Sequence, residues 1–254
     1  MKKIFPFSNK KPESRQKSDF SQKKITVVTN LILLVVLAVV LAVSFLPEKI
    51  APIYGGEAVS PIYNGNKKNA DVSLMFNVYE GTDIVNGILD VLKEKDVKAT
   101  FFIGGCWADD NGETLKRICE EGHELGNHGY FHKDHKKLGY KENKEEIETA
   151  GQVIYALSGV KPALFAPPSG SFSAVTLDCC SDLEYKLIMW SKDTIDWRDK
   201  DAEKVYSRAT RNPENGDLIL MHPKRHTLSA LDKIIDFYVN QGFNIVTVGE
   251  NISE

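Results

Sequence analysis

The sequence predicts an α/β protein, a distorted (β/α) barrel of about seven parallel strands preceded by one transmembrane helix. An uncharged apolar run covers residues 25–46, and from residue 71 onward short apolar runs alternate with amphipathic, helix-like stretches. Polar side chains recur directly after the predicted strands. A chain of 254 residues with 42% hydrophobic content can bury one substantial core, which favours one large domain over two of similar size.

Charge divides the chain into a basic leader and an acidic body. Residues 1–24 hold eight Lys/Arg and two Asp/Glu, which leaves 24 basic and 33 acidic groups in residues 25–254. An acidic body argues against a nucleic-acid partner, because the phosphate backbone attracts basic surfaces. The basic leader is better explained by membrane orientation.

Residues 25–46 form the predicted membrane anchor, since about 20 apolar residues suffice to cross the hydrocarbon core. The excess of Lys/Arg before the run places the N-terminus in the cytoplasm and everything after residue 46 outside the cell membrane. A cleaved signal peptide is the alternative, with Ala42-Val43-Ser44 as its cleavage site. Signal peptides have apolar regions of only ~7–15 residues, so the longer run favours a single-pass anchor.

Residues 47–70 are predicted to be a spacer, because Pro, Gly and Asn recur there without periodicity. Two Ile-Tyr pairs leave room for part of it to pack on the domain as an extra strand. The four cysteines lack metal-type CxxC spacing and are expected to be buried or free thiols.

The predicted domain covers residues 71–254. Its strand-like runs are VSLMFN, KATFFIGG, HELGNH, PALFAP, YKLIMW, DLILMH and FNIVTV. Helix-like stretches cover residues 83–95, 112–121, 141–158, 202–210 and 228–241. Strand-helix alternation indicates a parallel sheet, and a parallel barrel carries its chemistry at the carboxyl ends of the strands.

Histidines mark one of these strand ends. His128 and His132 directly follow the run HELGN, and His135 lies three positions further on. Two imidazoles four residues apart can hold one divalent ion such as Zn²⁺ if the segment turns helically. An isolated HxxxH also fits a surface histidine cluster on a polar loop, so the spacing alone leaves both interpretations open.

Five motifs in order extend this signal over residues 71–248. They are ILDVLKE at 88–94, VKATFFIGG at 97–105, EGHELGNH at 121–128, DTIDW at 193–197 and LMH at 220–222. This stretch resembles the polysaccharide deacetylase family, also called carbohydrate esterase family four. The residues at 76–81 and 165–170 resemble the membrane-anchored, sporulation-associated branch of spore-forming bacteria.

The resemblance implies a distorted barrel that removes acetyl groups from N-acetylated sugars in chitin-like or peptidoglycan-like polymers. In such enzymes an aspartate and two histidines hold a divalent metal, of the zinc or cobalt type, and a second aspartate is the base. Here His128 and His132 match the metal histidines, and His222 matches the late histidine that protonates the departing amine. The implied substrate pocket is lined by Trp197, Leu220, Pro167 and Pro168.

Three positions depart from the family pattern. Where the family has Thr-Phe-Asp-Asp-Gly, Asn77 occupies the position of the base and Val78 that of the metal carboxylate. An amide does not accept a proton near neutral pH, and valine has no donor atom. Ala166 stands in place of the arginine that helps to fix the base.

Nearby side chains offer substitutes. Glu80 or His135 is the candidate third metal ligand, and Asp193 or Asp196 is the candidate base. Glu80 also fits a solvated loop edge. Asp83 lies in the same loop, where capping of the following helix is favoured over catalysis.

Two functions from different classes therefore remain open. The first is a metal-dependent hydrolase of carbon–nitrogen bonds in cell-wall sugars, and the retained histidines favour it. The second is a non-catalytic, membrane-tethered module of the same fold that binds wall glycan, in which the metal is absent. The sequence does not indicate an oligomeric state.

Overall fold

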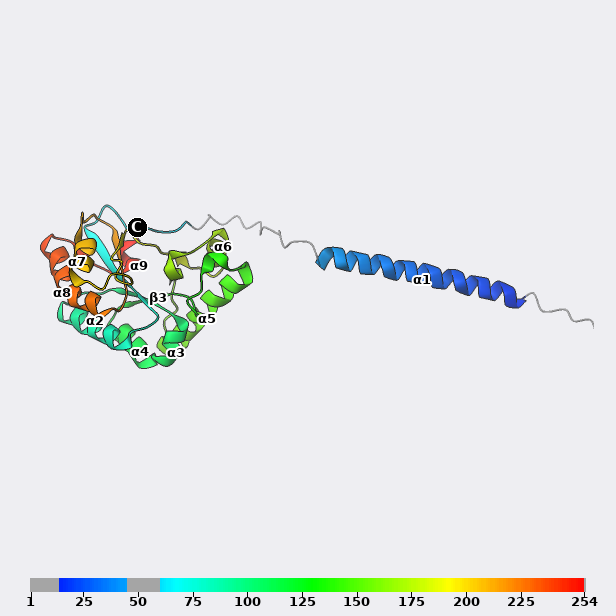
Figure 1. Cartoon of the computed structure of the whole chain (residues 1–254), viewed down its shortest axis with the longest axis horizontal. Helices are drawn as coiled ribbons and strands as arrows, with labels where there is room; N and C mark the ends of the chain where they lie inside the picture. The colour runs from blue at the N-terminus through cyan, green and yellow to red at the C-terminus, as the bar shows by residue number, and fades with distance from the viewer. Residues whose placement is uncertain (1–13, 45–59, 254) are drawn as a thin grey trace, which may run out of the picture. The chain divides into compact units, whose positions relative to one another are not determined.

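The computed structural model describes residues 14–44 and 60–253, which fall into two compact units, Met1–Gly55 and Gly56–Glu254 (Figure 1). In the first unit, the helix α1 (Ser14–Ser44) begins within the predicted basic leader. Its stretch Lys24–Leu41 is apolar and long enough to cross a membrane, and none of it is buried. A signal sequence has the same properties, so the anchor stays a prediction. The last two residues of the predicted span lie outside the described residues.

The second unit is built on a parallel sheet, as the sequence predicts. Seven strands follow one another in the order β5-β4-β3-β2-β1-β7-β6 as a half-barrel, and β8 pairs with β1 outside this path. β6 lies where no strand was predicted. The bounds are β1 Asp71–Val78, β2 Thr100–Ile103, β3 Glu124–Asn127, β4 Leu164–Phe165, β5 Lys186–Leu187, β6 Lys192–Asp193, β7 Asp217–Met221 and β8 Asn244–Ile245.

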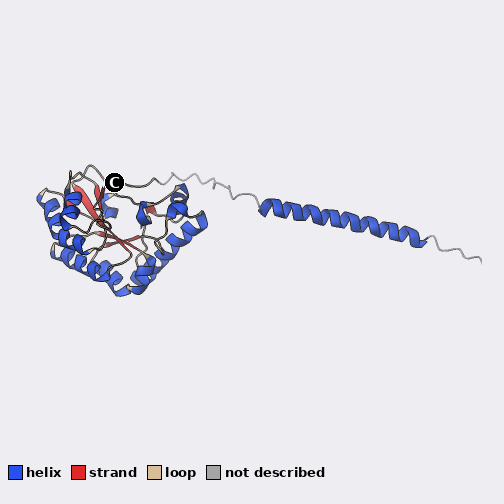
Figure 2. Cartoon of the chain, viewed as in Figure 1, coloured by secondary structure: helices blue, strands red, loops and turns tan. Residues whose placement is uncertain are grey.

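Helices lie along the outer side of the strands (Figure 2). All five helix-like stretches of the sequence are helices, with ends within a few residues of the predicted ones, whereas α3, α6 and α9 are additional. The bounds are α2 Thr82–Glu94, α3 Gly105–Asp110, α4 Gly112–Glu120, α5 Tyr140–Ser158, α6 Ala174–Asp182, α7 Ala202–Thr210, α8 Arg225–Asn240 and α9 Val248–Asn251.

Strand β1 has apolar side chains on both faces, because it lies at the centre of the sheet between β2 and β7. Successive side chains of a strand point to opposite faces. Phe76 and Val78 belong to the cluster that also contains the apolar side chains of α2, α4 and α8. Met75 belongs to a second cluster, with Phe102 and Leu220. The alternation thus assigns Asn77 to the face of Met75 and Val78 to the helix-covered face.

Residues 60–70 of the predicted spacer pack on the domain. Ile62 forms a parallel bridge with Ile188, donating its N–H to Leu187 O at 2.9 Å and accepting from Met189 N at 2.8 Å. This pairing covers the edge strand β5, which would otherwise expose unpaired backbone groups. Residues 47–59 lie outside the described residues.

Candidate functional site

The carboxyl ends of the strands bring together three histidines around the ring of Tyr79. The ring centroid of Tyr79 lies 4.2 Å from that of His132, 6.1 Å from His128 and 6.4 Å from His222. The rings of His128 and His132 are 5.1 Å apart. The three histidines thus share one end of the sheet, as their places in the sequence predict, whereas Tyr79 was not among the predicted residues.

His128 is held rigidly behind β3. It is fully buried, and its Nδ1 lies 2.7 Å from the carbonyl oxygen of Ala166. Because a carbonyl only accepts, Nδ1 carries the proton and Nε2 has a lone pair. Among the residues that the structure describes, Nε2 has no hydrogen-bond partner. Burial, and then the neighbouring His132, lowers the pKa of His128 well below its usual range, so the imidazole is neutral.

The loop from His128 to His132 does not turn helically. Gly129 has φ 74° and His132 has φ 55°, so two left-handed residues bring the second imidazole back toward the first. Glu146 of α5 fixes this loop: one carboxylate oxygen accepts from the N–H groups of Tyr130 and Phe131, at 3.1 and 2.8 Å. Glu146 is 3% exposed, and sequence reasoning missed it because it lies in the middle of an ordinary amphipathic helix.

Asn77 and Val78 occupy the two positions at which the family has aspartates. Asn77 is 2% exposed, and its Oδ1 has no hydrogen-bond partner within residues 14–44 and 60–253. Val78 is fully buried in the hydrophobic cluster under the helices. Val78 therefore has no atom that could bind a metal. Its side chain also packs in the apolar core, on the face of β1 opposite to that of Asn77.

His222 and Asp196 form a buried pair. Asp196 Oδ1 lies 2.7 Å from His222 Nδ1, and its Oδ2 accepts from the backbone N–H of His222 and from Thr227 Oγ1, both at 2.7 Å. Burial alone would raise the pKa of Asp196, but these hydrogen bonds outweigh it and lower the pKa. Asp196 is thus fully engaged in orienting His222, which leaves Nε2 of that ring as the atom for chemistry.

Glu80 and Asp193 are engaged elsewhere, whereas His135 has one ring nitrogen, Nε2, that is buried and has no hydrogen-bond partner among the described residues. Glu80 forms an ion pair with Lys224, His135 is buried with its Nδ1 2.7 Å from Asn143 Oδ1, and Asp193 accepts from a backbone N–H in its own loop. The described residues contain no group of three or more His, Cys, Asp or Glu side chains placed to hold a metal ion. A third ligand from Glu80 or His135 therefore stays a prediction.

The capping prediction for Asp83 was wrong. The N-cap of α2 is Gly81, whose φ of 78° suits glycine, and no side chain caps this helix. Asp83 lies instead in the first turn, where the positive end of the helix dipole stabilises its negative charge.

A divalent metal of the family type is poorly matched by the donors present. His128 Nε2 is a buried atom that no other described residue contacts by a hydrogen bond, which suits a metal ligand. Position 78, however, offers no donor, and the ring of Tyr79 lies 4.2 Å from that of His132. The residues in place thus supply two of the three expected ligands.

The predicted pocket residues differ in exposure. Leu220, Pro167 and Pro168 are buried, whereas Trp197 is 53% exposed. Phe131, which was not predicted, is 61% exposed and follows β3, while Trp197 follows β6. In the strand order β2, β1 and β7 lie between these two strands. One exposed ring thus lies within the His128–His132 loop itself, and the other lies in the loop after β6, the strand that pairs with β7 ahead of His222.

Known proteins resemble this chain in sequence and in fold. It is 37% identical to YlxY of Bacillus subtilis over 76% of this chain and 61% of that protein. The peptidoglycan-N-acetylglucosamine deacetylase of Bacillus cereus is 32% identical over 73% of this chain and 70% of its own length. The chain thus spans less than two thirds of YlxY.

A solved structure gives a similar result. The CE4 family pseudoenzyme BA3943 of Bacillus anthracis superimposes with a TM-score of 0.75 at 36% identity, covering 77% of this chain and 70% of that chain. A mutant of BA3943 is described as having restored enzymatic activity. The family model of polysaccharide deacetylases matches residues 64–188. On its strand order, its motifs and these similarities, the chain belongs to the polysaccharide deacetylase family, carbohydrate esterase family four.

Proposed function

We propose that this protein binds amino-sugar polymers of the cell wall at the strand-end face and does not deacetylate them. The observation that carries the proposal is the sequence Asn77-Val78-Tyr79 at the end of β1, which replaces both family carboxylates and sets an aromatic ring against His132. The relatives that deacetylate peptidoglycan suggest the polymer, and the similar CE4 pseudoenzyme offers a precedent for a family member without activity.

Amide hydrolysis at this site would need a group that takes a proton from water. Asn77 cannot do so near neutral pH. Asp196 is the carboxylate that contacts His222, but both of its oxygens already accept hydrogen bonds. The acid partner of the family mechanism is thus kept while the base and one metal ligand are replaced.

Glycan binding would rely on the exposed rings. Phe131 and Trp197 are 61% and 53% exposed, and each has a cationic side chain beside it, Lys133 and Arg198. Those cations are paired, Lys133 with Glu146 and Arg198 with Asp199. The apolar faces of such rings can pack on the C–H faces of a neutral sugar.

A residual metal-dependent hydrolase is the second candidate, and one observation favours it. His128 Nε2 is buried with a free lone pair, and the His222–Asp196 pair keeps its geometry. If a carboxylate from a neighbouring loop completed the ligand set, zinc or cobalt could polarise the acetyl carbonyl. The side chains at the end of β1 do not complete that set, which makes this candidate the weaker of the two.

We place the domain outside the cell, tethered by residues 25–46, in keeping with the wall polymers on which the named relatives act. A role in sporulation is proposed from the resemblance of residues 76–81 and 165–170 alone.

Surface labelling tests this location. Cys106 is exposed and Cys179 and Cys180 are buried, so a membrane-impermeant maleimide should label wild-type protein in intact cells. The Cys106→Ser variant should lose most of that label. Labelling of Cys106 only after lysis would place the domain inside.

Binding of N-acetylglucosamine oligomers tests the glycan proposal. In the full chain in detergent, Trp197→Ala or Phe131→Ala should weaken binding roughly three- to tenfold, because each removes about 1 kcal/mol of ring packing. The matched control is Tyr155→Ala, which removes a ring that is 57% exposed on α5. Equal affinity in all variants would contradict the proposed surface.

Acetate release separates the two candidates. Wild-type protein supplied with zinc or cobalt should release none from peptidoglycan or from N-acetylglucosamine oligomers. Asn77→Asp should also release none, since it restores the base and not the third ligand. Release by wild-type protein would establish the hydrolase, and release by Asn77→Asp alone would make Asn77 the only disabling change.

A further inference from the structure

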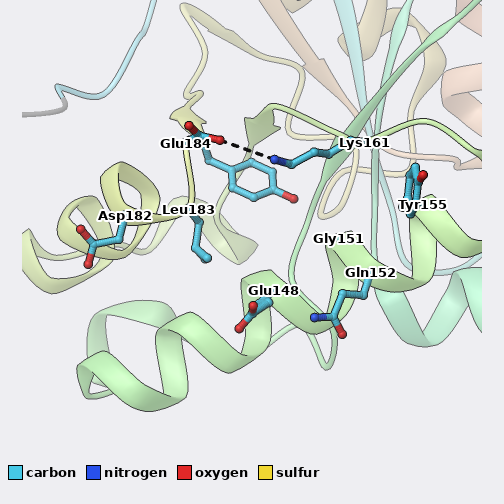
Figure 3. Close-up of a pocket in the computed structure, with 9 residues that line it drawn as sticks. Glu148, Gly151, Gln152, Tyr155, Lys161, Asp182, Leu183 and Glu184 are labelled. Atoms are coloured by element: carbon cyan, nitrogen blue, oxygen red, sulfur yellow. Dashed lines mark ion pairs between the residues drawn. The ribbon is translucent and has the colours of Figure 1, made fainter.

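Six residues other than glycine have a left-handed backbone in the part of the chain that the structure describes. Three of them lie two positions after the last residue of α2, α6 or α7, where helices commonly end in this conformation: Asp96, Glu184 and Asn212. Figure 3 shows Glu184 in the turn between α6 and β5, paired with Lys161. The other three lie in loops at the carboxyl ends of strands: His132, Ser169 and Ile195. Left-handed residues outside helix ends thus gather at the strand-end face.

Of these three residues, Ile195 has the side chain least suited to this conformation. Its φ of 53° brings Cβ close to the following carbonyl oxygen, and a β-branched residue is rarely found there. The side chain is partly exposed and belongs to none of the three hydrophobic clusters that the described residues form. Packing in the core therefore does not account for the strain. A strained residue persists only where the surrounding structure holds it, so backbone contacts of this loop must supply the stabilisation.

Asp193 makes the first of these contacts. It is the last residue of β6, and its Oδ1 accepts from the N–H of Ile195 at 2.7 Å. An aspartate that accepts from the backbone two residues on closes a local turn. The carbonyl of Ile195 accepts in addition from the N–H groups of Arg198 and Asp199, at 3.2 and 3.0 Å. Both peptide groups that flank Ile195 are therefore hydrogen-bonded.

Two helices fix the chain on either side of this turn. Arg208 of α7 donates from Nη1 to the carbonyl of Thr194 at 3.0 Å. His226 of α8 has its Nε2 2.7 Å from the carbonyl of Asp196, and because a carbonyl only accepts, this nitrogen carries the proton. The carbonyls of residues 194, 195 and 196 thus each have a donor, and the turn at Ile195 is held at both ends.

The turn sends the next two side chains in different directions. Asp196 is 1% exposed, and its carboxylate binds both Nδ1 and the backbone N–H of His222. Trp197, the following residue, is 53% exposed. Asp196 is retained by its own hydrogen bonds, so the ring of Trp197 is the group that a change in the backbone of Ile195 would move.

We propose that Asp193 is a positioning residue of the strand-end face. By accepting from the N–H of Ile195, its side chain stabilises the left-handed turn and so fixes the ring of Trp197 before any ligand is bound. A ring that is already ordered loses less conformational entropy on binding, which strengthens binding without a new contact. Asp193 thus acts through the backbone and not as a base. The inference rests on the proposed function only where binding of glycan is measured.

Fluorine NMR of the full chain in detergent, labelled with 5-fluorotryptophan, tests this role without a ligand. Trp197→Phe identifies the signal of Trp197. Asp193→Ala should shift and narrow that signal because the ring gains freedom, whereas Asp193→Asn should leave it unchanged because the amide oxygen still accepts from Ile195. In the Asp193→Ala background, Ile195→Gly should move the signal back toward its wild-type position, since glycine adopts a positive φ without support.

Asp201→Ala is the matched control. Asp201 also accepts from backbone N–H groups, those of Glu203 and Lys204 at the start of α7. Its replacement should leave the signal of Trp197 in place, which separates the turn at Ile195 from the loss of any nearby carboxylate. A wild-type signal in Asp193→Ala would overturn the inference, and so would an equal shift in Asp193→Asn.

Binding of N-acetylglucosamine oligomers is the second readout. Asp193→Ala should weaken binding about three- to fivefold, and Asp193→Asn should bind as wild type. Wild-type affinity in Asp193→Ala, in a chain that does bind the oligomers, would also overturn the inference. If the wild-type chain bound no oligomer, the proposed function would fail, while the fluorine signal of Trp197 would still decide the role of Asp193.

Discussion

The alternation of side chains along β1 is the constraint on which the candidate site depends. This strand pairs with both β2 and β7, so its position and twist are fixed from two sides. Because side chains alternate along a strand, Val78 packs in the core beneath the helices and Asn77 lies on the opposite face of the sheet. Tyr79, the next residue, places its ring against that of His132. Changing the chemistry at this strand end therefore requires more than one substitution, since one of the two family positions is now part of the core.

The side chains that the site shares with the family pattern are held in place by groups that also stabilise the fold. Asp196 ties the loop after β6 to His222 and to Thr227 of α8, and Glu146 ties α5 to the histidine loop. A buried carboxylate that loses its hydrogen-bond partners destabilises the fold, so such groups persist for stability even where catalysis is lost. Retention of His222 and Asp196 is thus weak support for activity by itself.

The sequence predicted a distorted barrel of about seven parallel strands, and the structure has seven such strands in a half-barrel. It also predicted that His128, His132 and His222 lie at one end of the sheet, because strand periodicity and the order of the motifs show which residues follow each strand. It did not predict Tyr79 or Glu146. Tyr79 acts through a contact between its ring and that of His132, and Glu146 accepts hydrogen bonds from backbone N–H groups of a loop distant in sequence. Neither contact produces a recognisable pattern in the neighbouring sequence. The capping of α2 was missed for a similar reason, since Gly81 acts through its backbone conformation alone.

The central claim is that the residues at the end of β1 do not complete a metal site, and the affinity of the chain for zinc tests this claim most directly. Calorimetric titration of the full chain in detergent with Zn²⁺ should show no stoichiometric binding at roughly micromolar protein. His128→Ala should leave the titration unchanged. Tight binding of one zinc ion by the wild-type chain that is lost in His128→Ala would contradict the account, because it would require a third ligand that β1 does not provide.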